Sequence, residues 1–351
     1  MSTSSSNGQH AFSLFHILSE QAARVPERAA IAAPGRSAMT YRHLIKRLCR
    51  IQEALHGLGI GRNDRAALAL PPGPELAVAL LGVASTATCV PIHPADECME
   101  AYLSDLHMKA VILPFGKKDK AHTAIHRNGV SVLELMPVPE TEAGFFALNG
   151  HTRFAPAPQE LPQDNDLAFI LPPTHADPYV QLIGFTHAQL SLAAWQVAAR
   201  LKLDMSDSCL SVVPPFHSHG LVADLLASLM VDANVVCPPH FQADTFFQWL
   251  DTCRPSWYTA EPSIQEAIVA SAPQHGERIR RCPLRFIRSA SGALTPRVSR
   301  ALERIFRAPV IDAHGTPEIP GPLGEAYGPS STLSAPRREA WATASLAAVS
   351  A

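Results

Sequence analysis

Short, wholly apolar runs alternate with amphipathic segments in the first part of the chain. The runs 66–70, 89–92 and 110–113 predict strands. Pro72, Gly73 and Pro74 open a helix that continues through Gly82, and a second helix ends near His107. Short strands that are apolar on both faces, with proline at a helix start, are typical of a parallel sheet covered on both sides.

The same alternation returns between residues 167 and 312. It predicts strands at 167–171, 209–213, 234–237, 257–259, 284–288 and 310–311. Helical patterns lie between them, for example at 221–230, 245–252 and 296–306. The chain is therefore predicted to be an α/β protein with two stacked sheet-and-helix subdomains.

Changes in composition set the expected boundaries. Residues 1–11 are polar and expected to be disordered, and residues 12–165 form the first α/β subdomain with a linker, rich in Pro, Glu and Gly, at 136–165. Residues 166–318 form the second subdomain. Residues 319–351, dominated by Ala, Ser, Pro and Arg, are expected to be a poorly ordered tail.

Composition and charge exclude several classes of protein. Hydrophobic residues make up 47% of the 351, so a large core can form, and the formal charge of −2 favours neither nucleic acid nor an anionic membrane. The longest apolar run, 76–83, is too short to span a bilayer. Seven cysteines without a C-x-x-C pair indicate reduced thiols, and the N-terminus has no signal pattern. A cytoplasmic protein is expected.

Five motifs in a fixed order resemble one enzyme family, the AMP-forming acyl-CoA synthetases (the adenylate-forming superfamily that includes luciferases). They are LGIGRNDR (58–65), LPPGPE (70–75), THAQL (186–190), PFHSHG (215–220) and RSASGAL (288–294). The resemblance runs from about Phe12 to Glu318. It implies an N-terminal part that binds ATP between stacked α/β subdomains, with the second subdomain, residues 166–318, on the nucleotide and acyl side.

The resemblance also implies the reaction and the cofactors. Family members couple a carboxylic acid to AMP with ATP and Mg²⁺, release pyrophosphate and transfer the acyl group to a thiol such as CoA. A smaller C-terminal domain of about a hundred residues supplies a lysine for the first step. Nothing after Glu318 resembles that domain. We therefore expect a small-molecule carboxylate as substrate and a protein partner that supplies the domain.

Site residues follow from the matched motifs. The resemblance places Ser289, Ser291 and Gly292 beside the adenine, and His217 and His219 at the acyl pocket. It assigns His314, Gly315 and Thr316 to nucleotide binding, Glu318 to Mg²⁺ and catalysis, and Trp257 and Tyr258 to the acyl channel.

Several of these positions have a structural alternative. An H-x-H pair on extended chain also directs both imidazoles to one side, where they could bind a metal, or each could serve the structure alone. Trp257 and Tyr258 suit core packing equally well. Thr186 and His187 are expected to cap and open the helix through Ala199 rather than contact substrate.

The phosphate-binding loop departs from the family pattern. Relatives carry a Ser/Thr/Gly-rich loop ending in Pro-Lys-Gly, whose amides and hydroxyls hold the triphosphate. Aligned without gaps, Gln181 takes the position of the lysine and His175 that of a glycine, and Thr174 is the one Ser or Thr left in the loop. The resemblance makes all three candidates for nucleotide binding, and Thr174 also a candidate catalytic residue. Asp177 adds a negative charge, and Pro317 replaces the threonine that precedes Glu318.

Two functions of different classes therefore remain. The chain is either a carboxylate–CoA ligase that is impaired or inactive alone, or a non-catalytic binding or scaffold protein with the same fold, including a truncated gene product. The altered loop favours the second reading, and family membership favours the first.

Overall fold

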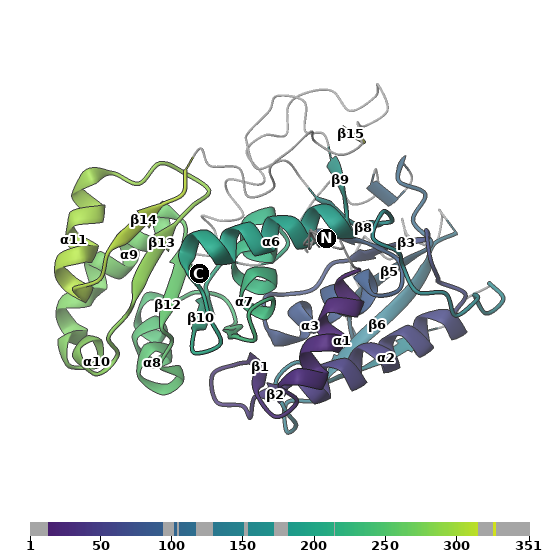
Figure 1. Ribbon diagram of the computed structural model, residues 1–351, viewed down its shortest axis with the longest axis horizontal. Coiled ribbons are helices and arrows are strands. Elements are labelled where there is room, and N and C mark those ends of the chain that lie inside the picture. Colours follow the sequence, from purple (N-terminus) through teal and green to yellow (C-terminus); the bar gives the residue numbers. More distant parts are fainter. Residues whose placement is uncertain are drawn as a thin grey trace, which may run out of the picture.

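The computed structural model describes residues 13–93, 102–103, 105–116, 129–150, 154–171, 182–213, 215–314 and 326–327, the last pair by its backbone (Figure 1). Helical elements are α1 Leu14–Arg24, α2 Tyr41–Gly57, α3 Pro74–Ala84, α6 His187–Leu201, η1 His219–Leu226, α7 Ala227–Leu229, α8 Ala243–Cys253, α9 Pro262–Ser271, η2 Ala272–His275, α10 Gly276–Arg281 and α11 Pro296–Phe306. Strands are β1 Ala29–Ala32, β2 Met39–Thr40, β3 Arg65–Leu68, β4 Thr88–Pro91, β5 Ala110–Pro114, β6 Ser131–Pro137, β7 Phe146–Gly150, β8 Leu167–Leu171, β9 Leu182–Thr186, β10 Ser208–Ser211, β11 Asn234–Val236, β12 Trp257–Ala260, β13 Phe286–Ser289, β14 Val310–Asp312 and β15 Ala326–Tyr327.

The strands form two sheets. Sheet I has eight strands in the order β15-β9-β8-β4-β3-β5-β6-β7, and sheet II has seven in the order β14-β13-β12-β10-β11-β1-β2. The central strands of both sheets are parallel, and antiparallel pairs occur toward the edges. The predicted α/β class with two stacked sheets is confirmed.

The two sheets do not divide the chain at the predicted boundary between residues 165 and 166. Strand β8 lies after that boundary but pairs in parallel with β4 of sheet I, and β9 continues the same sheet. Strand β1 lies near the N-terminus but pairs in parallel with β11 of sheet II. Each half of the sequence therefore contributes strands to both sheets.

The predicted linker at 136–165 contains regular structure. Strand β7 pairs antiparallel with β6, with Leu148 opposite Leu135, and Phe146 is fully buried. The sequence did not predict this β6–β7 hairpin, because the Pro, Glu and Gly residues between the two strands conceal the alternation of apolar and polar positions. The expected N-terminal disorder at 1–11 lies outside the described residues. In the expected tail, Ala326 and Tyr327 pair with β9.

A single hydrophobic core joins the two sheets. Helix α3 is buried along its whole length, because it contacts β3 and β4 of sheet I on one side and β1 of sheet II on the other. A helix that is apolar all round needs such a position. Sheet I thus shares one continuous core with the inner face of sheet II.

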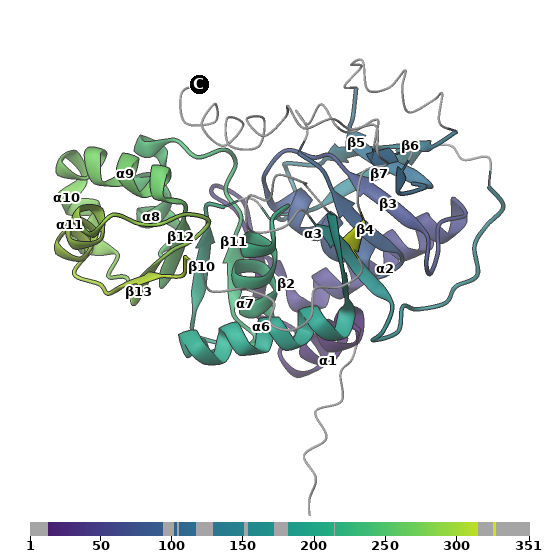
Figure 2. The same ribbon diagram turned by 90° about the horizontal axis from the view of Figure 1, so that it is seen from above.

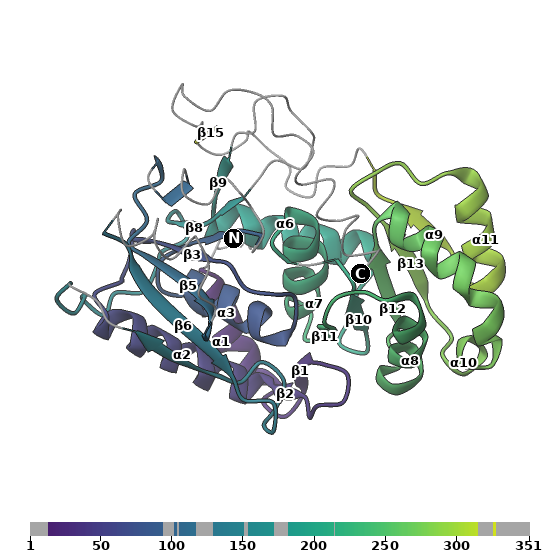
Figure 3. The ribbon, with the colours of Figure 1, turned by 180° about the vertical axis from the view of Figure 1, so that it is seen from behind.

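Further helices cover the remaining faces. Helices α8, α9 and α11 pack on the outer face of sheet II around a second core (Figure 3). Helix α6 lies alongside both halves: it contacts β8 and β9, and it also contacts η1 and α7, which pack on β10 and β11 (Figures 1 and 2). No helix in the described part of the chain is long and apolar enough to cross a membrane.

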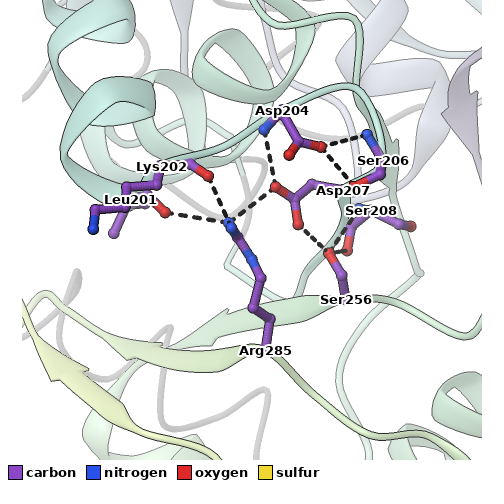
Figure 4. Close-up of polar contacts among 8 residues, drawn as sticks. All are labelled: Leu201, Lys202, Asp204, Ser206, Asp207, Ser208, Ser256 and Arg285. Atoms are coloured by element: carbon purple, nitrogen blue, oxygen red, sulfur yellow. Dashed lines mark hydrogen bonds and ion pairs between the residues drawn. The ribbon is translucent and has the colours of Figure 1, made fainter.

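A network centred on Arg285 fastens the end of α6 to sheet II (Figure 4). The guanidinium of Arg285 donates to the carbonyl oxygens of Leu201 (3.2 Å) and Lys202 (2.8 Å), at the negative end of the helix dipole. It also lies 2.9 Å from the buried carboxylate of Asp207, which accepts a hydrogen bond from the Ser256 hydroxyl at 2.7 Å. The ion pair and its hydrogen bonds thus connect the end of α6 with the amino ends of β10 and β12.

We expect Asp207→Asn to lower the free energy of unfolding by about 2 kcal/mol, because it removes the charge of a buried carboxylate that pairs with the partly exposed guanidinium of Arg285. Urea unfolding measures the difference. Glu277→Gln is the matched control: the Glu277–Arg281 pair is exposed, and its loss should cost less than about 1 kcal/mol. Equal effects of the two substitutions would contradict the assigned role of Asp207.

Candidate functional site

Three loops leave the carboxyl ends of adjacent strands of sheet II and meet at one edge. Strands β12, β13 and β14 are parallel neighbours, with Ala260 opposite Ser289 and Ser289 opposite Asp312. The backbone N–H of Ala290 donates to the Ala260 carbonyl, and that of Ala313 to the Ser289 carbonyl. In open α/β sheets, ligands bind outside the carboxyl ends of strands. This edge is therefore the candidate site.

The turn after β13 holds the residues predicted to lie beside adenine. Ser289 is fully buried, and within the described part of the chain no hydrogen-bond partner reaches its Oγ. Ser291 is exposed in the left-handed conformation (φ 68°), and a Cβ built on Gly292 would lie 3.3 Å from Cγ of Pro262. A buried hydroxyl with no protein partner, beside small residues, fits the polar edge of a nucleotide.

The loop after β14 lies next to this turn. His314 is exposed, and its backbone N–H donates to Oδ1 of Asp312 at 3.0 Å. The structure therefore brings four of the predicted nucleotide-binding residues to one edge of sheet II: Ser289, Ser291, Gly292 and His314. The other predicted residues of the nucleotide and metal sites lie outside the described residues: Thr174, His175, Gln181, Gly315, Thr316 and Glu318.

A row of buried polar side chains crosses three strands of sheet II near their carboxyl ends. Ser211 of β10 lies opposite Thr259 of β12, and Thr259 lies opposite Arg288 of β13. Because side chains alternate along a strand, these register partners share one face, the face toward η1. We call Ser211, Thr259 and Arg288 the polar row.

The π-helix η1 covers the polar row with two side chains. Oγ1 of Thr259 lies 2.6 Å from Nε2 of His219, and the Arg288 guanidinium lies 2.7 Å from Nδ1 of His219. The Ser211 hydroxyl donates to the buried carboxylate of Asp224 at 2.9 Å. The same guanidinium nitrogen lies 3.0 Å from Nε2 of His219, and because arginine only donates, the imidazole accepts from it. Single π-helical turns are frequent at functional sites.

His217 lies at the same edge, in an aromatic group that reaches sheet I. Phe216 packs edge-on against His217 (ring centroids 4.7 Å apart) and against His93 (5.2 Å), which follows β4. Burial, with smaller contributions from the neighbouring His93 and His219, lowers the pKa of His217 to about 4. His217 is therefore a neutral imidazole at physiological pH, located where the two sheets approach each other.

Trp257 and Tyr258 are both fully buried and point to opposite faces of sheet II. Trp257 stacks on Phe286 in the core between the sheets, and Tyr258 packs in the outer core, with its hydroxyl donating to Gln265 at 2.8 Å. Of the two roles considered for these residues, these positions fit core packing.

The predicted extended H-x-H geometry is wrong. Residues 215–218 form a turn that leads into η1, so His217 and His219 are not alternate residues of a strand. Both ring nitrogens of His219 already face Thr259 and Arg288. Among the described residues, no group of three His, Cys, Asp or Glu side chains could hold a metal ion.

The helix-capping role of Thr186 is confirmed. Its hydroxyl accepts from the N–H of Gln189, whose side chain accepts from the N–H of Thr186, a complete capping box at the start of α6. His187 is fully buried, and its Nδ1 accepts from the Leu14 N–H at 3.2 Å. Both residues serve the fold here.

Sequence reasoning missed the polar row and Asp224. One signal was available: Arg288 directly follows the apolar pair Phe286 and Ile287 in the predicted strand 284–288, and a charged residue in a buried strand is unusual. No comparable signal marked Ser211, Thr259 or Asp224. Their proximity depends on strand register and on the π-helical winding of η1.

Two hollows of the described surface lie away from this edge of sheet II. A cavity of about 280 Å³ is lined by Gly61, Arg62 and Lys109 near the amino ends of sheet I, and one of about 550 Å³ by Phe15, Leu161 and Gln163. Neither contains a residue of the candidate site.

Comparison with known sequences identifies related proteins. Residues 18–343 match the sequence profile of the family described as AMP-binding enzyme. The chain is 30% identical to a probable CoA ligase from Humulus lupulus over 86% of its length and to an oxalate–CoA ligase from Arabidopsis thaliana over 86%, and 27% identical to a sulfoacetate–CoA ligase from Cupriavidus necator over 87%. It spans about 60% of the length of these curated relatives (59%, 60% and 60%).

Solved structures show the same fold. A benzoate–CoA ligase from Burkholderia xenovorans superposes with a TM-score of 0.71, over 87% of this chain and 61% of that one. Its sequence identity is 21%, so this likeness concerns the fold alone.

Proposed function

Because the chain belongs to the AMP-binding enzyme family, we propose that it forms the nucleotide- and acid-binding part of an AMP-dependent CoA ligase. In this proposal the protein activates a carboxylic acid as its acyl-AMP, with ATP and Mg²⁺, and CoA accepts the acyl group.

The observation that carries the proposal is the meeting of three loops at one edge of sheet II. The turn Ser289–Gly292, the start of α9 at Pro262 and the loop before His314 lie together there. They stand at the carboxyl ends of parallel strands, the usual ligand position of this fold class. The unpartnered buried hydroxyl of Ser289 supports a ligand at this edge.

Each group has a task in this proposal. Ser289, Ser291 and Gly292 hold the adenosine side of the nucleotide, and the neutral His217 borders the acid without adding charge. Bound ATP supplies the AMP group and the pyrophosphate leaving group. From the sequence, Glu318 is the residue proposed to hold Mg²⁺, because a hard cation prefers carboxylate oxygen.

A second candidate is a non-catalytic protein that binds nucleotide or acid. The sequence of the loop 173–181 favours it: Gln181 stands where relatives have lysine, and Asp177 places negative charge near the phosphates. Binding is common to both candidates, and turnover separates them.

We expect ATP with Mg²⁺ to raise the thermal midpoint of unfolding. A ligand that binds only the native state stabilises it by about 2.7 kcal/mol at a hundred times its Kd, which corresponds to several degrees. Differential scanning fluorimetry with ATP, and with GTP as the control, measures this. An unchanged midpoint in millimolar ATP would contradict both candidates as nucleotide-binding proteins and leave an acid-binding role.

A further inference from the structure

Arg288 is a charged side chain in a position that normally belongs to the core. It is 5% exposed, and on the same face of β13, two residues earlier, Phe286 stacks on Trp257. A buried cation is costly unless hydrogen bonds and opposite charge compensate it. Its position at the carboxyl ends of the sheet II strands, where ligands of this fold class bind, makes Arg288 a candidate for contact with an anionic substrate group.

The surroundings of Arg288 hold its guanidinium in a fixed orientation. His219 contacts one terminal nitrogen, and Thr259 in turn holds His219, so the order of contacts is Thr259, His219, Arg288. All three side chains are buried. A guanidinium presents its N–H donors in a planar fork that matches two oxygens of a carboxylate or sulfonate, and a fixed fork loses little entropy on binding.

Negative charge on the same face lies near the polar row. Burial raises the pKa of the Cys209 thiol, the Asp224 carboxylate raises it further, and the Arg288 guanidinium lowers it. Both charges thus act on one buried residue of β10. Asp224, which accepts from Ser211, thus adds a negative charge beside the row of side chains to which Arg288 belongs.

The polar row lies close to His217, which borders the acid in the proposed function. His219 is two residues after His217, and its ring lies 2.7 Å from the Arg288 guanidinium. An acid activated at this edge and also held by Arg288 must therefore be short, with its two acidic groups separated by few atoms. The relatives include enzymes named for oxalate and for sulfoacetate, acids of this description.

We propose that Arg288, oriented by His219 and Thr259, binds the second acidic group of a short substrate with two anionic groups, such as oxalate. This assignment rests on the proposed function and adds the substrate class to it. Arg288 sets the acid selectivity, and His219 is a positioning residue.

Oxalate and oxamate provide the test, because oxamate has the same size and replaces one carboxylate by a neutral amide. Isothermal titration of the whole chain, with and without ATP, measures both affinities. We expect the wild type to prefer oxalate over oxamate by about 10- to 100-fold, the range for hydrogen bonds to a charged group. Arg288→Met should abolish that preference. Arg288→Lys, which keeps the charge but not the fork, should retain part of it.

Controls separate this assignment from folding and from the proposed function. Arg297→Met removes an exposed arginine on α11 and should leave the preference unchanged. If Arg288→Met does not fold, the lysine variant and the wild-type preference decide the outcome. Equal wild-type binding of oxalate and oxamate, or a full preference in folded Arg288→Met, would overturn the assignment. An ATP-dependent rise in thermal midpoint alongside that result would leave the proposed function standing.

Discussion

Exchange of pyrophosphate into ATP, dependent on oxalate, is expected to be at least about 100-fold slower for this protein than for the Arabidopsis oxalate–CoA ligase. Adenylation requires preorganised donors around the departing pyrophosphate, and loss of one such donor costs about 10²- to 10³-fold. The loop 173–181 loses several: Pro173 and Pro178 have no amide N–H, and Gln181 is neutral. Asp177 adds repulsion. These losses affect one transition state, so they need not add.

The comparison requires matched proteins. This chain and the matching residues of the Arabidopsis oxalate–CoA ligase should each be joined to the C-terminal part of that ligase. The two fusion proteins then differ only in their N-terminal parts. Replacement of residues 173–181 by the relative's loop should raise the exchange rate by about 100-fold, whereas Gln181→Lys alone should restore little. Rapid exchange by the unchanged chain would refute the non-catalytic candidate and indicate that His175 or Tyr179 binds phosphate.

Acidification from pH 7.5 to pH 5 is expected to lower the free energy of unfolding by about 4 kcal/mol, about 2 kcal/mol from each of two histidines. Burial lowers the pKa of His187 to about 4, against the opposing effect of Asp166 and Asp164, and the pKa of His217 also falls to about 4. Both imidazoles are neutral in the native state and take up protons near pH 6.5 on unfolding.

The sign follows from proton uptake. Between pH 4 and 6.5 the unfolded chain binds more protons at these two positions, so stability falls as the pH falls and is fully regained above pH 6.5. Urea unfolding at pH 7.5 and pH 5 measures the change. Asn offers an acceptor near the place of Nδ1, so His187→Asn should reduce the pH dependence by about half. His240→Asn, at an exposed histidine, should not change it. A wild-type stability equal at both pH values would show that neither histidine is neutral in the fold.

Local patterns in the sequence were sufficient for much of the architecture. The apolar run at 167–171 forms β8 as predicted, because an uninterrupted apolar strand needs burial on both faces. The wholly apolar run 76–83 lies in α3, the helix between the sheets, for the same reason. Thr186 and Gln189 form the expected helix start, since a capping box depends on neighbours three residues apart.

The altered phosphate loop is likewise a property of the sequence. The replacement of lysine by Gln181 and the loss of amide donors at Pro173 and Pro178 follow from residue type and motif position. The prediction for pyrophosphate exchange therefore follows from the amino-acid sequence alone.

Tertiary structure decided the exchange of strands between the sheets and the composition of the proposed acid-binding side. Strand β1 has its partner β11 about two hundred residues later, and no local pattern encodes that choice. Ser211, Thr259 and Arg288 become neighbours only through the register of three parallel strands. The winding of η1 then brings His219 to Arg288 and Asp224 to Ser211. Burial determines the charge of His217, because desolvation depends on everything packed around the ring and not on its place in a motif.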